Sequence, residues 1–175
     1  IVLLSGNLKF SGYLDVFRDA SLLAAKLFAL LFGASMFSNF LNRAGFTDAL
    51  LGIINSFELS GIAVIFIILL IYILLGCIFE SMSMILLTVP IFAPLAQTLG
   101  FDLIWFGILV VVVTEISLIT PPIGLNVFVL KGVIKNVSVG TIFYGVTPFW
   151  ISDIIRLLIL TLIPGIALFL PSMMF

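Results

Sequence analysis

The sequence predicts an all-α polytopic membrane protein, in which transmembrane helices are combined with a re-entrant helical hairpin and a broken, unwound helix. Three observations lead to this fold class. The chain is 63% hydrophobic and 9% charged, with a mean hydropathy of +1.46, far above that of a soluble globular domain. Apolar runs of about 20 residues recur along it without the alternation typical of a membrane β-barrel. Two consecutive prolines, Pro121 and Pro122, interrupt what hydropathy alone would assign as one long helix.

Composition also excludes several function classes. The net charge of −1 provides no basic face that could neutralise phosphates, so no nucleic-acid partner is expected. The chain has no histidine, which removes His-based metal sites and His general bases, and we expect neither an enzyme nor a bound cofactor. The one cysteine, Cys77, cannot form an internal disulfide. The chain begins at Ile1 and shows no signal-peptide pattern, so we interpret it as a fragment or the C-terminal portion of a longer protein.

The first predicted unit, residues 1–58, contains one transmembrane helix and its flanking segments. The helix is expected from Leu14 to Leu41, because its entry is polar and a polar stretch ending at Gly45 follows it. Apolar residues then recur near a 3.6-residue period over Phe46–Phe57. That pattern favours an interfacial or connecting helix.

The second predicted unit, residues 59–136, opens with two apolar arms around a polar tip. The first arm, Leu59–Phe79, is long enough to cross a membrane, and the polar tip is Glu80–Ser83. The second arm, Met84–Gln97, has only about 14 residues, or about 21 Å at helical rise, against a hydrocarbon core of about 30 Å. We therefore predict a re-entrant hairpin over residues 59–97, with its tip buried against protein near the midplane.

A broken helix over residues 102–133 completes this unit. Its two prolines donate no backbone hydrogen bonds, and Pro121 disfavours the helical conformation at Thr120. Gly124 adds backbone freedom shortly before the helical pattern resumes. Unpaired carbonyls are costly in hydrocarbon, so such a break persists where protein or a polar cavity satisfies them. Transporters use broken helices of this kind to hold ions and substrates.

The third predicted unit, residues 137–175, is an amphipathic connector followed by the last transmembrane helix. We expect this helix from about Pro148 to Leu170, with a bend at Pro164–Gly165 and its end at Pro171. Asp153 and Arg156 are expected to form a local ion pair. The large aromatic residues that we expect to act as interface anchors are Trp105, Tyr144 and Trp150.

The positive charges predict the orientation. If the hairpin enters and leaves on one side of the membrane, the basic residues Lys9, Arg18, Lys131 and Lys135 share the opposite side. The positive-inside rule makes that side cytoplasmic and places the C-terminus in the periplasm.

Three polar clusters lie within apolar surroundings. They are Glu80 with Ser81 and Ser83, Thr114 with Glu115, and Ser117 with Thr120 and Asn126. A carboxylate at membrane depth is by default a functional hypothesis. For Glu80 two roles stay open, an ion ligand and a helix cap that accepts from the N–H groups of Ser83 and Met84. For Glu115 the alternative is a pair with another helix. Oxygen ligands on each side of unwound backbone suit a hard cation such as Na⁺.

Three stretches carry a resemblance to a known family. They read G-C-I-F-E-S-M-S-M-I-L-L-T-V-P-I-F-A-P-L (Gly76–Leu95), G-F-D-L-I-W-F-G-I (Gly100–Ile108) and T-E-I-S-L-I-T-P-P-I-G-L-N-V-F (Thr114–Phe128). They resemble the C-terminal half of the large membrane subunit, the DctM-like permease, of tripartite ATP-independent periplasmic (TRAP) transporters. The likeness covers essentially the whole chain from the first helix onward.

The resemblance implies one half of an inverted-repeat, elevator-type secondary transporter in the bacterial inner membrane. Such a transporter imports organic acid anions, of dicarboxylate or sugar-acid type, with Na⁺ as the coupling ion. The implied partners are a periplasmic substrate-binding protein, a small membrane subunit of the same transporter and the lipid bilayer. Because the fold needs two inverted repeats and one set is present, this chain alone is not expected to transport.

The resemblance places the site at the hairpin tip and the helix break. The expected substrate-binding residues are Ser81, Ser83, Pro121, Pro122 and Asn126. The expected sodium ligands are Glu80, Ser117, Thr120 and Gly124. This chain departs from the family pattern at Glu80-Ser81, where many members have Asp-Pro, and at Ser117, where a glycine is common. In the family, most of the oxygen ligands of sodium are backbone carbonyls and hydroxyls.

Two alternatives stay open. The chain could be the C-terminal half of another sodium–carboxylate symporter of similar architecture. It could also be a non-transporting membrane scaffold or assembly subunit, in which Thr120 and Asn126 would tolerate apolar replacements.

Overall fold

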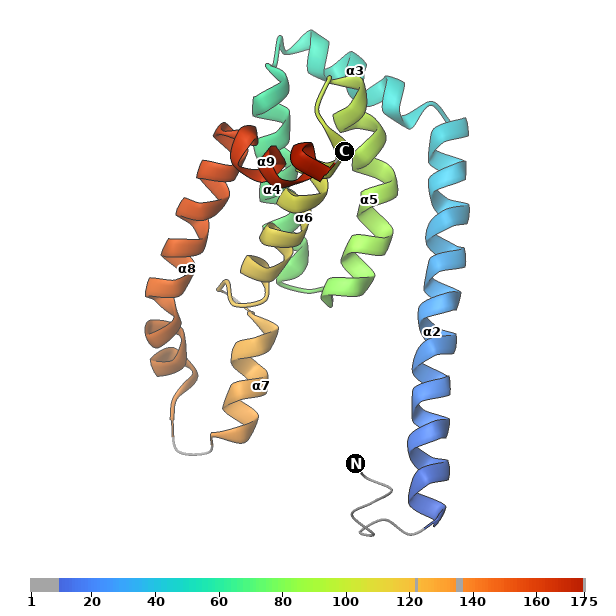
Figure 1. Ribbon diagram of the computed structural model, residues 1–175, viewed down its shortest axis with the longest axis vertical. Coiled ribbons are helices and arrows are strands. Elements are labelled where there is room, and N and C mark those ends of the chain that lie inside the picture. Colours follow the sequence, from blue (N-terminus) through green and yellow to red (C-terminus); the bar gives the residue numbers. More distant parts are fainter. Residues whose placement is uncertain (1–9, 122, 135–136, 175) are drawn as a thin grey trace.

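The computed structural model describes residues 10–121, 123–134 and 137–174, and all regular secondary structure in these residues is helical (Figure 1). This confirms the predicted all-α class. The helices are α2 (Phe10–Arg43), α3 (Phe46–Ser56), α4 (Gly61–Gly76), α5 (Ser81–Thr98), α6 (Leu103–Ser117), α7 (Leu125–Val133), α8 (Val139–Leu162) and α9 (Pro164–Met174).

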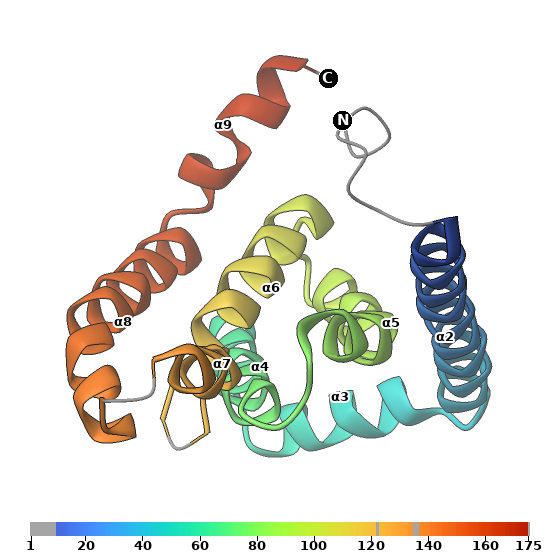
Figure 2. The same ribbon diagram turned by 90° about the horizontal axis from the view of Figure 1, so that it is seen from below.

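Within the described residues, three helices are long and apolar enough to cross a membrane, namely α2 from Gly12, α5 and α8. Helices α3 and α4 form a bent pair with an angle of 120°, which would make a fourth span if counted as one. The prediction of a polytopic membrane protein is confirmed. Figures 1 and 2 show α2 on one side of the molecule and α8 on the other, with α4, α5 and α6 between them.

A helical hairpin and a broken helix are both present at the predicted places, and the re-entrant placement of the hairpin stays a prediction. Helices α4 and α5 run in opposite directions and are joined by a short loop, residues 77–80. Helix α6 runs beside them and ends at Ser117, and α7 continues in the same general direction from Leu125. Figure 1 shows the hairpin loop at the level of the break, about midway along α2. The fold therefore places the hairpin loop close to the interruption in α6–α7.

The second arm of the hairpin is longer than predicted. Helix α5 has 18 residues, with Pro90 and Pro94 inside it, and its length alone would allow it to cross a membrane. The argument that this arm is too short to span is therefore wrong. It failed because Ser81, Met82 and Ser83, assigned to the tip, form the first turn of α5.

Short polar residues begin the helices of this core. Ser60, Glu80, Asp102 and Ser138 have extended backbone, and each accepts hydrogen bonds from backbone N–H groups in the first turn of α4, α5, α6 or α8. These are the donors that an α-helix leaves unpaired at its start. At the other end of α5, Gly100 has a φ of 86°, and Phe101 N–H donates to the Ala96 carbonyl at 3.0 Å. Glycine adopts this left-handed conformation easily, so it can end α5 and start the turn into α6.

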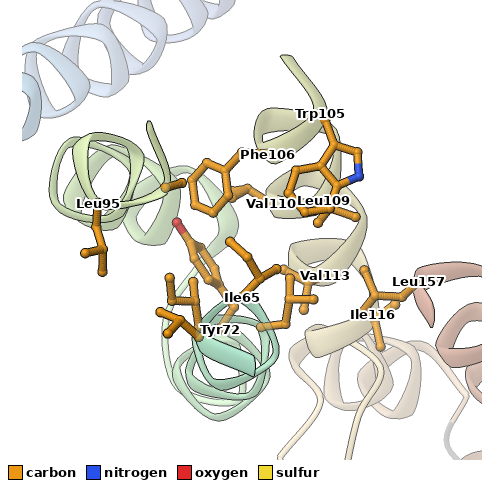
Figure 3. Close-up of a cluster of buried hydrophobic side chains, with 14 of the residues drawn as sticks. Ile65, Tyr72, Leu95, Trp105, Phe106, Leu109, Val110, Val113, Ile116 and Leu157 are labelled. Atoms are coloured by element: carbon orange, nitrogen blue, oxygen red, sulfur yellow. The ribbon is translucent and has the colours of Figure 1, made fainter. Parts of the chain in front are cut away.

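The buried core is centred on α6 (Figure 3). Leu109, Val113 and Ile116 of α6 are fully buried, and α4 and α8 contribute Tyr72 and Leu157 among others. Trp105 belongs to the same core, with 1% of its surface exposed, and its indole N–H donates to the Leu160 carbonyl of α8 at 2.8 Å. The prediction that Trp105 anchors the chain at a membrane interface is therefore wrong.

Helix α2 lies against α5 with most of its surface exposed, and it extends beyond the predicted Leu14–Leu41 at both ends. The Ser38 hydroxyl donates to the Pro90 carbonyl at 3.3 Å. A helix would normally satisfy that carbonyl with the N–H of residue 94, but Pro94 has none. Ser38 therefore supplies from α2 a donor that α5 lacks. A pocket of about 300 Å³ lies beside this contact, between the two helices.

The C-terminal part differs from the prediction of a single bent helix. Helix α8 begins at Val139, where Ser138 caps it. It therefore starts well before Pro148, which lies inside the helix. It ends at Leu162, and Ile163 leaves the helical conformation with φ −125° and ψ 75°. The following Pro164 disfavours helical backbone at that position. The second helix, α9, runs through Pro171 to Met174, so the prediction that Pro171 ends the helix is wrong.

Candidate functional site at the helix break and hairpin loop

The break between α6 and α7 is held by local backbone hydrogen bonds. Ile119 and Thr120 donate to the carbonyls of residues 116 and 117, so the last turn of α6 tightens before the prolines. Across the break, Asn126 N–H donates to the Leu118 carbonyl at 3.2 Å. Gly124 has a φ of 55°, and this left-handed residue lets α7 resume. These hydrogen bonds link the end of α6 to the start of α7.

The hairpin loop contacts this break directly. The Cys77 sulfur lies 4.0 Å from the Thr120 carbonyl oxygen and 3.9 Å from that of Pro121. It lies closer, at 3.3 Å, to the Ile73 carbonyl of its own helix. A thiol has one proton and is a weak donor, so the two carbonyls of the break keep most of their acceptor capacity. Carbonyl oxygens of this kind are suitable ligands for a hard cation.

Beside this contact, the end of α4 and the end of α6 pack without space for a further atom. A Cβ added to Gly76 would overlap both the Cβ and the Oγ of Ser117. Ser117 is fully buried there, and its hydroxyl donates to the Thr114 carbonyl at 2.6 Å. The structure therefore places Ser117 in the contact between α4 and α6. Its expected role as a sodium ligand stays a prediction.

Glu80 caps α5. Its carboxylate accepts hydrogen bonds from the N–H groups of Met82 and Ser83, at 3.0 and 3.1 Å, and from the Ser83 hydroxyl at 3.0 Å. The capping alternative for Glu80 is confirmed, with Met82 taking the place that we assigned to Met84. Glu80 is exposed, while Ser81 and Ser83 are half-buried. The expected roles of these three residues toward ion and substrate stay predictions.

Acidic side chains do not gather around this site. Within the described residues, no three His, Cys, Asp or Glu side chains are placed to hold a metal ion together. Glu115 lies exposed on α6, one turn before the break. A cation bound by this part of the chain would therefore be held mainly by carbonyl and hydroxyl oxygens.

Thr120 is fixed by two hydrogen bonds. It is 6% exposed, its hydroxyl donates to the Ile116 carbonyl at 2.7 Å, and the same oxygen accepts from the indole N–H of Trp150 at 2.8 Å. The prediction of Trp150 as an interface anchor is wrong, because its polar end faces the break. Sequence reasoning missed this role. The available signal was an indole N–H in an apolar helix, since a buried tryptophan usually finds an acceptor.

The other predicted residues have different surroundings. Pro121 and Asn126 are exposed, and Pro122 lies outside the described residues. The Gly124 carbonyl accepts from Val127 N–H at 2.8 Å, so its oxygen already serves the first turn of α7. Beside the break lies a pocket of about 250 Å³, lined by Ile119, Pro121, Phe143, Val146, Thr147 and Trp150.

Comparison with known families gives one match over most of the chain. Residues 1–166 match the family described as "Tripartite ATP-independent periplasmic transporter, DctM component".

Individual relatives carry related names. The chain is 31% identical, over 90% of its length, to the C4-dicarboxylate TRAP transporter large permease protein DctM of Pseudomonas aeruginosa. It is 29% identical over 99% of its length to the ectoine/5-hydroxyectoine TRAP transporter large permease protein UehC of Ruegeria pomeroyi. It is 34% identical over 57% of its length to the sialic acid TRAP transporter permease protein SiaT of Haemophilus influenzae. The chain spans 36%, 40% and 16% of these relatives, respectively.

Proposed function

Because the chain belongs to the family of the DctM component of tripartite ATP-independent periplasmic transporters, we propose that it forms the C-terminal part of a secondary transporter in the bacterial inner membrane. The complete permease imports an organic acid anion, of dicarboxylate or sugar-acid type, and couples this import to sodium. A periplasmic binding protein delivers the substrate, and a small membrane subunit of the same transporter supports the permease. The substrate class is kept broad because the relatives are named for different compounds.

The observation that carries this proposal is the meeting of the hairpin loop and the broken helix. Cys77 lies against the Thr120 and Pro121 carbonyls, and Gly76 packs on Ser117. A half-site made of a helix end and unwound backbone suits a coupling ion, because it offers carbonyl and hydroxyl oxygens in one place. In the proposal, Thr120 and the break carbonyls contribute to the sodium site, and Ser81, Ser83 and Asn126 face the substrate.

Two of the described basic residues support the proposed orientation. Arg18 is near the start of α2 and Lys131 near the end of α7, and these two helix ends lie toward the same end of the molecule (Figure 1). Arg43, in the last turn of α2, and the open ends of the hairpin lie toward the other end. We assign the first end to the cytoplasm and the C-terminus to the periplasm. Asp153 and Arg156 form the expected local ion pair within α8, at 3.1 Å.

Sodium dependence tests the proposal in the full-length permease, reconstituted with its small subunit and binding protein. Uptake of labelled succinate and sialic acid is measured with an inward sodium gradient and with choline in its place. We expect one or more of these compounds to be taken up only with sodium. Equal uptake with sodium and with choline would contradict the coupling of import to sodium. If none of the organic acids tested is taken up, the scaffold alternative is favoured.

Replacement of Asn126 by alanine tests its expected place in the site. We expect Asn126→Ala to raise the substrate concentration for half-maximal uptake about fivefold, the effect of losing one polar contact of about 1 kcal/mol. Gln97→Ala is the matched control, because Gln97 is an exposed amide at the other end of the hairpin. An unchanged half-saturating substrate concentration in Asn126→Ala would exclude this residue from the substrate site.

A cysteine at Ser81 tests the re-entrant arrangement. In a full-length permease without other cysteines, we expect Ser81→Cys to react with a membrane-impermeant maleimide from the periplasmic side, and only in some transport states. Thr98→Cys is the control, because Thr98 lies exposed at the open end of the hairpin and should react in all states. Labelling of Ser81→Cys solely from the cytoplasmic side refutes the re-entrant hairpin.

A further inference from the structure

We infer that Trp150 is a positioning residue for the helix break, and that it acts through the Thr120 hydroxyl. This inference rests on the proposed role of the break in binding the coupling ion. Trp150 lies on α8, outside the break itself, and its indole N–H donates to Thr120 Oγ1 at 2.8 Å. No other side-chain hydrogen bond in the described residues joins α8 to the break.

The hydrogen bonds of Thr120 explain what Trp150 can do. A threonine hydroxyl has one proton and two acceptor positions. The proton is donated to the Ile116 carbonyl, and Trp150 occupies one acceptor position. The hydroxyl is thereby fixed in rotation, with one lone pair left for a further partner. Without the indole donor, the Thr120 side chain and its peptide group would lose a constraint at the point where α6 ends.

A second contact from α8 lies on the other side of the break. A Cβ added to Gly124 would lie 3.2 Å from a ring carbon of Phe143, so this ring packs directly on the backbone where α7 begins. Phe143 and Trp150 are two helical turns apart on α8 and line the same pocket. Helix α8 therefore supports both ends of the break, by packing at Gly124 and by a directional hydrogen bond at Thr120.

Cys77 offers a readout that needs neither substrate nor ion. Its thiol is buried against the Thr120 and Pro121 carbonyls, so a break that moves more freely exposes this sulfur more often. In a full-length permease whose other cysteines are replaced, we expect Trp150→Phe to speed alkylation of Cys77 by N-ethylmaleimide about fivefold. The phenylalanine keeps an aromatic ring at this position and removes the N–H donor. A single lost hydrogen bond sets the size of the effect.

The chain contains a matched control. The indole N–H of Trp105 also joins α6 to α8, by donating to the Leu160 carbonyl at 2.8 Å, but it does so away from the break. Trp105→Phe therefore makes the same chemical change and should leave the alkylation rate of Cys77 unchanged. Equal rates in the two variants, or no increase in Trp150→Phe, overturn the proposal.

Stabilisation of the permease by sodium distinguishes a positioning role of Trp150 from a general loss of stability. We expect Trp150→Phe to raise the half-saturating sodium concentration for thermal stabilisation of the purified permease about threefold or more, relative to Trp105→Phe, with choline as the reference salt. Adding Trp150→Phe to Thr120→Val should cause no further change, because Trp150 acts through the hydroxyl that valine lacks. A further change in the double variant overturns the proposal.

The outcomes distinguish this inference from the proposed function. If sodium does not stabilise the wild-type permease, the sodium coupling fails, while the alkylation of Cys77 still decides the role of Trp150. If Trp150→Phe does not accumulate in the membrane, Trp150→His and Trp150→Met are compared, because histidine keeps a ring N–H donor and methionine has none. Equal rates of Cys77 alkylation in that pair overturn the proposal.

Discussion

Replacement of Gly76 by alanine is expected to lower the free energy of unfolding of the full-length permease by about 1–3 kcal/mol, the usual effect of overpacking a close contact. The added Cβ would overlap both side-chain atoms of Ser117, which is itself fully buried. A serine can rotate its hydroxyl away but cannot move its Cβ without shifting the backbone of α6. Thermal unfolding in detergent micelles measures the effect.

Two further variants make this result specific. Gly107→Ala is the control, because a Cβ added to Gly107 in α6 meets nothing within 4 Å, and alanine favours the helix. Ser117→Gly removes the atoms that the new methyl group would overlap, so Gly76→Ala with Ser117→Gly should recover most of the lost stability. A Gly76→Ala variant as stable as the wild type would show that α4 and α6 are less closely packed than described.

Replacement of Thr88 by valine is expected to lower the free energy of unfolding by about 1–3 kcal/mol, because it leaves a buried hydroxyl without a partner. The hydroxyls of Tyr72 and Thr88 lie 2.6 Å apart between the two arms of the hairpin, and Thr88 also donates to the Met84 carbonyl at 2.7 Å. A threonine has one proton, so Tyr72 supplies the proton of the bond between them. Tyr72 is fully buried, and valine offers its hydroxyl no acceptor.

Replacement of the other partner, Tyr72, is the control for this pair. Tyr72→Phe removes the tyrosine hydroxyl, and Thr88 keeps its hydrogen bond to Met84. We expect Tyr72→Phe to be less destabilising than Thr88→Val, and the double variant to be more stable than Thr88→Val alone. Chemical or thermal unfolding of the four proteins gives the coupling between the two positions. If Tyr72→Phe is as unstable as Thr88→Val, the loss of stability comes from changed packing and not from an unpaired tyrosine hydroxyl.

The hairpin and the break could be predicted from the sequence because both have local causes. Pro121 limits its neighbours through its own ring, and Glu80 is a polar residue at the point where an apolar run has to turn. These effects act within a few residues, so a single sequence contains them. The same holds for Asp102 and Ser138, which begin α6 and α8 by capping.

Other features depend on distant partners. Helix α5 runs through Pro90 and Pro94, and the donor that Pro94 lacks comes from Ser38 of α2, 52 residues from Pro90 in the chain. Trp105 and Trp150 were assigned to membrane interfaces from their residue type, whereas the acceptors of their indole N–H groups are 55 and 30 residues away in the chain. Neither acceptor could be identified before the helices were placed in space.

The contact between Ser38 and Pro90 affects how α2 and α5 can shift along one another. Around this hydrogen bond the facing side chains are mostly aliphatic or small, among them Leu31, Ala34 and Ile85, and such side chains provide no further directional contact. A hydrogen bond between membrane helices contributes about 0.6 kcal/mol on average, close to the thermal energy RT at room temperature. The Ser38 hydrogen bond therefore favours one register of α5 against α2, but the cost of breaking it would oppose a shift of α5 along α2 only weakly.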